Sequence, residues 1–246
     1  MAARTAGVEP PACGRVVTMT ADSIVAAAVA NNAAWCDLVC RCAGLATVRG
    51  PALWSTPRRS PVAYPDAVTL RPNVPEAEVL GAVDDSPGAS VKDSFADLDL
   101  APYGWSVLFD ARWVTRSAPS AAALQLPWRT VDRDALPRWL DAHGSDAITP
   151  GVLDDPDVRL LLAADGDVAL AVAALNRSGA GTRTVVGVSN VQALAVEPDR
   201  VWSDLVLLAR DLLGPHPLVG YESGDDLAAP LTAGFEPVGP LRVWLR

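Results

Sequence analysis

The closing stretch of the chain, residues 184–246, constrains the fold more than any other feature, because strand and helix patterns alternate throughout it. The elements follow in the order strand, helix, strand, helix, strand, over residues 184–196, 199–214, 217–222, 225–235 and 236–246. Strands that alternate with helices are typical of a sheet whose faces are covered by helices. We therefore expect an α/β fold.

The preceding residues extend this pattern back to residue 104. An alternating strand pattern covers 104–116, a linker 117–128 and an amphipathic helix 131–144. An aspartate–glycine turn at Asp165-Gly166-Asp167 then predicts a β-hairpin. We expect residues 104–246 to form one mixed sheet flanked by helices.

The first hundred residues predict a smaller, mixed region. A helix is expected over Ala21–Cys42, with Thr20 as its cap and Gly44 after its end. A strand over 67–72 and a helix over 75–85 follow, whereas residues 91–100 read equally as a helical turn or an irregular connection. The predicted organisation is a disordered tail (1–19), an N-terminal helical and partly stranded α/β region (20–103) and the main domain (104–246).

The element order over 104–246, with Gly234-Phe235 closing the last helix, resembles the GNAT superfamily of acyl-CoA N-acyltransferases. The resemblance implies a GNAT-like mixed sheet in which the fourth strand and the strand after it splay apart. It also implies that the pantetheine arm of acetyl-CoA or another acyl-CoA lies in this gap. The pyrophosphate is then expected at the N-terminus of the following helix, where free N–H groups and the helix dipole attract anions.

The residues that the resemblance assigns to the cofactor lie at the end of the fourth strand. Leu194, Ala195 and Val196, in the sequence LAVEP, align with the segment whose amides pair with pantetheine. The glycine-rich loop that should follow is replaced by Asp199-Arg200-Val201-Trp202-Ser203-Asp204, which contains no glycine. We expect Arg200 and Ser203 to donate to the pyrophosphate, while Asp199 and Asp204 oppose it.

The catalytic assignment departs further from the family pattern. Many members carry a tyrosine, a general acid for the departing thiolate, at the position of Pro230, and proline has no proton to give. Tyr221 and Glu222, at the end of the fifth strand, are the nearest substitutes and our candidate catalytic residues. In the alternative interpretation both are structural: Tyr221 is an aromatic residue at the boundary of the core, and Glu222 caps the following helix.

Two functions are consistent with these departures. The first is an acyl-CoA-dependent N-acyltransferase with a degenerate cofactor loop, acting on a small-molecule or peptide acceptor. The second is a catalytically inactive GNAT-fold module that binds a small molecule or a protein. Whether the chain is an enzyme stays open at this point, as do the acyl group, the acceptor and the oligomeric state.

Composition excludes several other classes. The net charge of −9 and a pI of about 4.6 argue against binding nucleic acids or anionic membranes, which attract basic surfaces. The four cysteines (Cys13, Cys36, Cys40 and Cys42) and two isolated histidines do not have the spacing of a metal site. We expect no metal, and we interpret the cysteines as small buried residues in a reducing, cytoplasmic compartment.

Two further segments have a possible binding role. Ser189-Asn190-Val191 places polar groups inside an apolar strand, which predicts a β-bulge, a substrate-facing pair or a satisfied buried pair. The loop over residues 54–66 combines aromatic side chains with adjacent Arg58 and Arg59, a pair type suited to anionic or planar ligands. A packed proline-rich loop is the alternative interpretation of the second segment.

Overall fold

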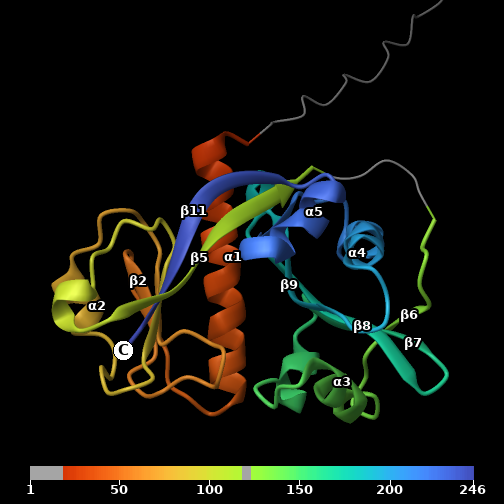
Figure 1. The fold of residues 1–246 in the computed structure, drawn as a ribbon, viewed down its shortest axis with the longest axis horizontal. Helices are drawn as coiled ribbons and strands as arrows, with labels where there is room; N and C mark the ends of the chain where they lie inside the picture. Colours follow the sequence, from red (N-terminus) through yellow and green to blue (C-terminus); the bar gives the residue numbers. More distant parts are fainter. Residues whose placement is uncertain (1–18, 118–122) are drawn as a thin grey trace, which may run out of the picture.

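The computed structural model describes residues 19–117 and 123–246, so the predicted tail lies almost wholly outside the described residues. Within them, one mixed sheet of eleven strands crosses the whole molecule (Figure 1). In spatial order the strands are β1 (Val48–Arg49), β2 (Leu53–Ser55), β3 (Ala67–Thr69), β4 (Ser90–Asp93), β11 (Glu236–Leu245), β5 (Ser106–Arg116), β10 (Leu218–Glu222), β9 (Val185–Ala193), β8 (Val168–Ser178), β7 (Val158–Asp165) and β6 (Trp128–Thr130). The α-helices are α1 (Ala21–Cys42), α2 (Glu76–Leu80), α3 (Leu136–His143), α4 (Pro198–Leu213) and α5 (Ala228–Thr232). The prediction of an α/β fold is confirmed.

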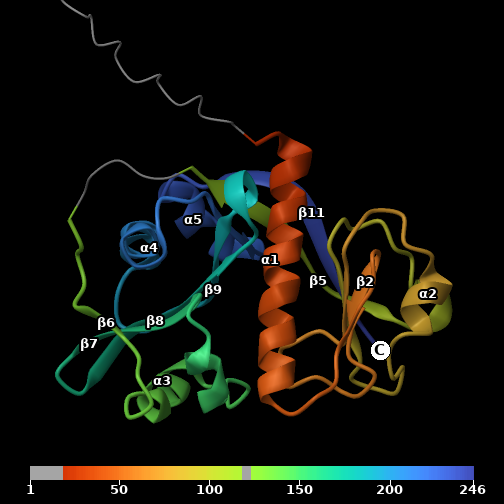
Figure 2. The same ribbon diagram turned by 180° about the vertical axis from the view of Figure 1, so that it is seen from behind.

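The first helix has the predicted bounds. The Thr20 side chain accepts a hydrogen bond from the Ser23 amide, and Gly44 takes a positive φ just past the end, where only glycine is unstrained. Figure 2 shows α1 running across the middle of the sheet, between the two halves of the molecule. Among the described residues, α1 is the helix whose length and hydropathy would suit a membrane span, but 61% of its most apolar window is buried in this fold. Its apolar character is therefore accounted for by the core.

The centre of the sheet is built by an exchange of strands between the two halves. β5 follows β4 along the chain, yet β11 lies between them; β11 follows β10, yet β5 lies between them. Outward from this central antiparallel pair, each half continues in the same way, with a parallel pair (β4–β3 or β10–β9) and then an antiparallel neighbour. The sheet therefore contains two copies of one topology, and the N-terminal copy is the smaller.

The strand predicted over 104–116 is present as β5, and the exchange places it in the centre of the sheet. Ala111, Trp113 and Val114 are buried there between β10 and β11. The edge strand beside β7 is β6, which begins at the last residue of the segment expected to be a linker.

Other differences from the sequence-based expectations are local. Residues 91–100 are neither a helical turn nor wholly irregular, because the segment begins within β4, which pairs with β3 and β11. The helix expected over 75–85 is confined to α2, and β2 lies in a stretch expected to be a loop. The helix expected from residue 131 begins only at Leu136, with Pro137 in its first turn, a position where proline loses no hydrogen bond.

Candidate functional site

The strands β9 and β10 separate after a short parallel contact. They pair only at Val186 with Leu218 and at Gly187 with Val219, so the rest of β9 has no strand partner on that side. A β-bulge interrupts β9 at Asn190, whose φ is +54°, and two residues of β9 oppose one residue of β8 at this point. The predicted splay and the predicted bulge are both present.

A first cavity of about 430 Å³ lies in this gap. Its walls come from the end of β9, the start of α4 and the segment after β10. The acidic side chains that line it are Asp199, Glu222, Asp225 and Asp226, and no lysine or arginine is among its lining residues. The gap is therefore open, and its electrostatic potential is negative.

Glu222 is the unusual member of this acidic group. Burial raises the pKa of its carboxyl to about 8, and the nearby Asp226 contributes to the same effect. Its side chain lines the first cavity and also a second one of about 250 Å³. A carboxyl group that titrates near neutrality at the junction of two cavities has the properties of a general base.

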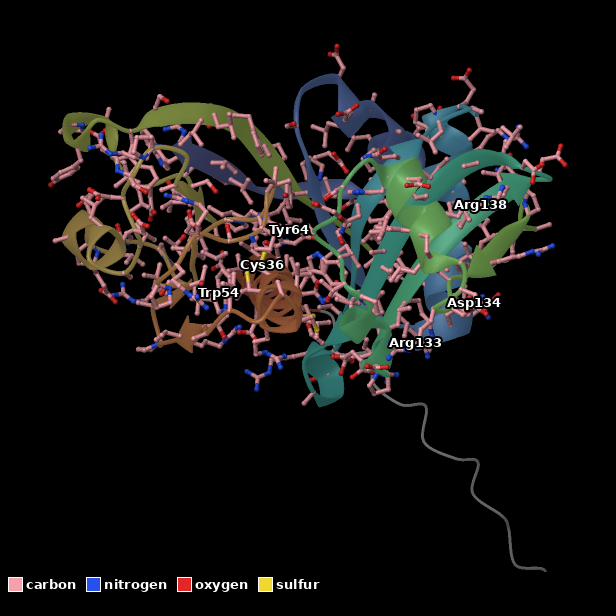
Figure 3. The ribbon with its side chains drawn as sticks, turned by 90° about the horizontal axis from the view of Figure 1, so that it is seen from below. Cys36, Trp54, Tyr64, Arg133, Asp134 and Arg138 are labelled. Atoms are coloured by element: carbon pink, nitrogen blue, oxygen red, sulfur yellow. The ribbon has the colours of Figure 1, made fainter. Side chains whose placement is uncertain are left out.

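The second cavity is formed jointly by the two halves of the sheet and by α1. Asn32 and Cys36 come from α1, Tyr64 from the loop after β2, and Lys92 from β4. Figure 3 shows Cys36 and Tyr64 close together in the middle of the molecule, at a distance from the labelled residues around α3. The N-terminal region thus supplies one wall of the candidate site.

Tyr221 faces this second cavity and not the first. Its hydroxyl accepts a hydrogen bond from Lys92 Nζ at 3.2 Å, and the same ammonium lies 4.4 Å from the centroid of the tyrosine ring. Of the two predicted catalytic residues, the structure therefore places Glu222 at the gap and Tyr221 on the far side of it. Their catalytic roles stay predictions.

Two polar residues of the bulge also reach this cavity. Asn190 donates to the Ser189 hydroxyl at 3.0 Å, and both side chains line the second cavity. The predicted alternatives thus coincide, because the pair satisfies itself in part and also faces the cavity. From the loop over 54–66, the aromatic Tyr64 lines this cavity, whereas neither Arg58 nor Arg59 does, and Arg59 is paired with Asp66.

The stretch predicted to pair with pantetheine lies just past the end of β9, and its role toward a ligand stays a prediction. The amides of Leu194 and Ala195 both donate to the Leu170 carbonyl, and Val196 packs against the core beside α4. Sequence alignment to a strand end cannot show this, because the bulge at Asn190 shifts the register by one residue. The cavity is lined instead by Val191, Gln192 and Ala193.

The start of α4 also differs from expectation. Asp204 does not oppose a ligand at the gap, because it is fully buried and accepts hydrogen bonds from the Gln125 and Leu126 amides and from Trp128 Nε1. Arg200 is exposed and donates to the Gln125 carbonyl, and neither Arg200 nor Ser203 lines the first cavity. A role of these two residues toward a pyrophosphate stays a prediction.

Sequence reasoning missed Lys92, Asn32 and Gln192 as site residues. Gln192 lines both cavities, and its amide group donates to the His143 carbonyl. Lys92 carried one signal that could have found it, since it is the only lysine among twenty basic residues. Asn32 carried none, because a polar residue in an apolar helix has many structural explanations.

Comparison with solved structures decides the fold. The chain superposes on a GCN5-related N-acetyltransferase from Kribbella flavida with a TM-score of 0.59 and 17% identity, over 89% of this chain and 95% of that one. This is a GNAT-fold protein. A putative GNAT-family acetyltransferase from Novosphingobium aromaticivorans is also similar, with a TM-score of 0.55, 14% identity and coverage of 88% and 97%.

A functionally unknown conserved protein from Staphylococcus epidermidis has a similar structure, with a TM-score of 0.55 and 12% identity over 82% of this chain and 94% of that one. The sequence matches no protein-family model and no curated protein. At these identities the likeness establishes the GNAT fold, including the N-terminal half, and leaves the chemistry to the site itself.

Proposed function

We propose that this GNAT-fold protein is an acyltransferase that moves an acyl group from an acyl-CoA thioester to an amine. The observation that carries the proposal is the open gap between β9 and β10, with Glu222 between two cavities. One cavity suits a donor that enters along the free edge of β9. The other suits an acceptor held by α1, the loop after β2 and β4.

The fit to acyl-CoA differs along the length of that molecule. The thioester-bearing arm fits, since the edge of β9 beyond Gly187 lacks a strand partner and backbone amides there need no particular side chain. The diphosphate is opposed, because Asp199, Asp225 and Asp226 line the same cavity and the bulky Trp202 of α4 lines it as well. We therefore infer weak binding of the nucleotide end.

The chemistry assigned to this chain is proton transfer at Glu222. An acyl-CoA bound in the gap would supply an electrophilic thioester carbonyl. The Glu222 carboxylate accepts a proton from the ammonium of the acceptor, and the freed nitrogen lone pair forms the new C–N bond as the C–S bond breaks. The nitrogen of the product then loses its second proton to solvent and becomes a neutral amide. A pKa of about 8 brings this carboxylate close to the basicity of an amine, which favours the transfer.

Protonation of the departing thiolate does not require a residue on α5 in this scheme. Pro230 is buried there and offers no proton. A thiol has a pKa of roughly 8.5, so its thiolate is a tolerable leaving group near neutrality, and the proton held by Glu222 can return to it. Attack at the carbonyl is then the step that depends on Glu222.

The alternative is a GNAT-fold module that binds a ligand without turnover. The acidic lining of the first cavity and the proline in place of the family's tyrosine favour it. The open gap favours the enzyme, because the free edge of β9 leaves room for a thioester beside Glu222. We give this second observation more weight, since it concerns the place where the thioester would react.

The experiment is a calorimetric titration of the protein with acetyl-CoA and with CoA. We expect dissociation constants in the micromolar to millimolar range, and loss of binding in Ala193→Trp, whose larger side chain would fill the first cavity. Leu231→Trp on α5 is the matched control, because Leu231 is exposed and does not line the cavity. Absence of binding to the unmutated protein at millimolar CoA would contradict the proposal.

A further inference from the structure

A buried ammonium without an anionic partner lies where three walls of the site meet. Lys92 is only 4% exposed, and its Nζ donates to the Asn32 side-chain oxygen at 2.8 Å and to the Tyr221 hydroxyl at 3.2 Å. Both acceptors are uncharged groups. Among the described residues, no aspartate or glutamate forms an ion pair with it.

The charge state of Lys92 makes this arrangement costly for the protein alone. Burial by itself lowers the pKa of this amine, whereas Tyr221, which accepts one of its hydrogen bonds, raises that pKa above the ordinary value. Cys36 is not its counterion, because burial raises the pKa of that thiol and keeps it protonated. A buried charge is normally paired, and an ammonium has three protons to donate, of which two have partners here.

Lys92 also marks the junction of two cavities. The 250 Å³ cavity that reaches Glu222 and a third cavity of about 520 Å³ share Lys92, Tyr64 and Tyr221 among their lining residues. The third cavity, here called the apolar lobe, lies over β4, β5 and β11. Its apolar wall is formed by Val62, Leu108, Phe109, Val243 and Leu245.

The apolar lobe is lined by one other basic side chain, Arg59, which already has an acidic partner. Arg59 forms an ion pair with Asp66 at 2.6 Å and donates to the carbonyl oxygens of Asp84 and Ser86. Lys92 is therefore the positive group in this lobe that lacks a negative partner. A ligand that combines an anionic group with an apolar body would satisfy both the ammonium and the wall beside it.

We propose that Lys92 binds the carboxylate of an apolar amino acid, whose side chain lies in the apolar lobe and whose amine points toward Glu222. This identification of the acceptor rests on the proposed function, because it assigns the amine to the acyl-transfer step. The binding of the carboxylate does not depend on it. A carboxylate supplies the missing counterion, and Glu222 lines the same cavity as Lys92.

The test uses three probes without any CoA present: L-phenylalanine, L-phenylalaninamide, which lacks the carboxylate, and 3-phenylpropanoate, which lacks the amine. Calorimetry on the full chain should show binding of both carboxylates. The amide should bind about ten- to a hundredfold more weakly, the loss expected for one charge-assisted hydrogen bond. Inorganic phosphate is titrated as a fourth probe.

Lys92→Met keeps the length of the side chain and removes its charge. This variant should lose the preference for the carboxylates over the amide. Its melting temperature without ligand should equal or exceed that of the unmutated protein, since a buried unpaired charge has been removed. Arg242→Met is the matched control, because it removes one positive charge from the same sheet at a residue that lines neither cavity, and it should leave the preference intact.

Three results would overturn the proposal. They are equal affinity for phenylalanine and its amide, an unchanged preference in Lys92→Met, and binding of phosphate but of neither carboxylate. If acyl-CoA does not bind but the carboxylate probes and Lys92→Met behave as expected, the proposed function is overturned and the carboxylate site stays in place. The reverse pattern would leave the acyltransferase with an acceptor of another chemistry.

Discussion

The two halves of the sheet share a topology, yet only one has an open gap. In the C-terminal half the parallel strands β9 and β10 part after Gly187 and Val219, and a cavity follows. In the N-terminal half the corresponding strands β3 and β4 end in a closed junction, because the Ser94 amide donates to the Thr69 hydroxyl at 2.8 Å and both residues are fully buried. In the N-terminal half, this hydrogen bond joins the ends of β3 and β4 at the position where the C-terminal half has its cavity.

The helices that follow the first strand of each parallel pair differ as well. α4 has sixteen residues and presents its N-terminus to the gap, whereas α2 has five. The smaller copy does not form a gap of its own between β3 and β4. Its strand β4 instead contributes Lys92 to the cavity of the larger copy. The comparison shows that topology alone does not make a GNAT-type site; the gap must remain unfilled by the chain.

The largest expected effect comes from removing the strand that both halves share. Deleting residues 240–246 should abolish soluble folded protein, because β11 pairs with both β4 and β5 and buries Leu241 and Trp244. Expression, solubility and thermal unfolding measure this. Arg242→Ala, which removes a surface ion pair with Asp110, should stay folded. A truncated protein that is soluble and melts cooperatively would show that the two halves do not depend on the shared strand.

The closed junction of the N-terminal half can be tested by Thr69→Val. The substitution preserves shape but leaves the buried Ser94 amide without its acceptor, so the free energy of unfolding should fall by about 1–3 kcal/mol. Denaturant titration measures the change. The control Thr184→Val removes a hydroxyl hydrogen bond at the surface and should cost less than about 0.5 kcal/mol. Equal effects would mean that this bond does not close the junction.

The open gap of the C-terminal half has a pH signature through Glu222. The folded carboxyl keeps its proton up to about pH 8, whereas the unfolded one loses it near 4.5, so unfolding releases a proton between these values. Stability should therefore fall as pH rises through this window, by at most about 1.4 kcal/mol per pH unit.

Glu222→Gln should remove that contribution, and thermal unfolding of both proteins from pH 5 to 8 measures the difference. If turnover is observed, kcat/KM should rise with an apparent pKa near 8 in the unmutated protein. Parallel stability curves for the two proteins would indicate that Glu222 ionises normally and that the gap is well solvated.

The smallest expected effect concerns the start of α4. Arg200 is the basic residue in the first turn of this helix, and we predict that Arg200→Ala weakens CoA binding about tenfold. Arg210→Ala, at the other end of α4, is the control. Unchanged affinity in Arg200→Ala would place the nucleotide end of CoA away from this helix.

The sequence predicted most elements of the larger copy because each carries a local signal. The hairpin turn at Gly166, the long β9–α4 run and the glycine after α5 all depend on neighbouring residues. The exchange of β5 and β11 left no such signal, since a central strand and an edge strand can have the same alternation. The place of Lys92 depended on contacts with Asn32 and Tyr221, residues far away along the chain.

The exchanged strands have a consequence for synthesis of the protein. β5 ends at Arg116, but the strands on both of its sides begin only at Leu218 and Glu236. While the ribosome makes the intervening residues, β5 has two unpaired edges, and unpaired edges are prone to association with other chains. Pairing of β5 must then wait until β10 and β11 have been made, and such long-range pairing predicts slow folding.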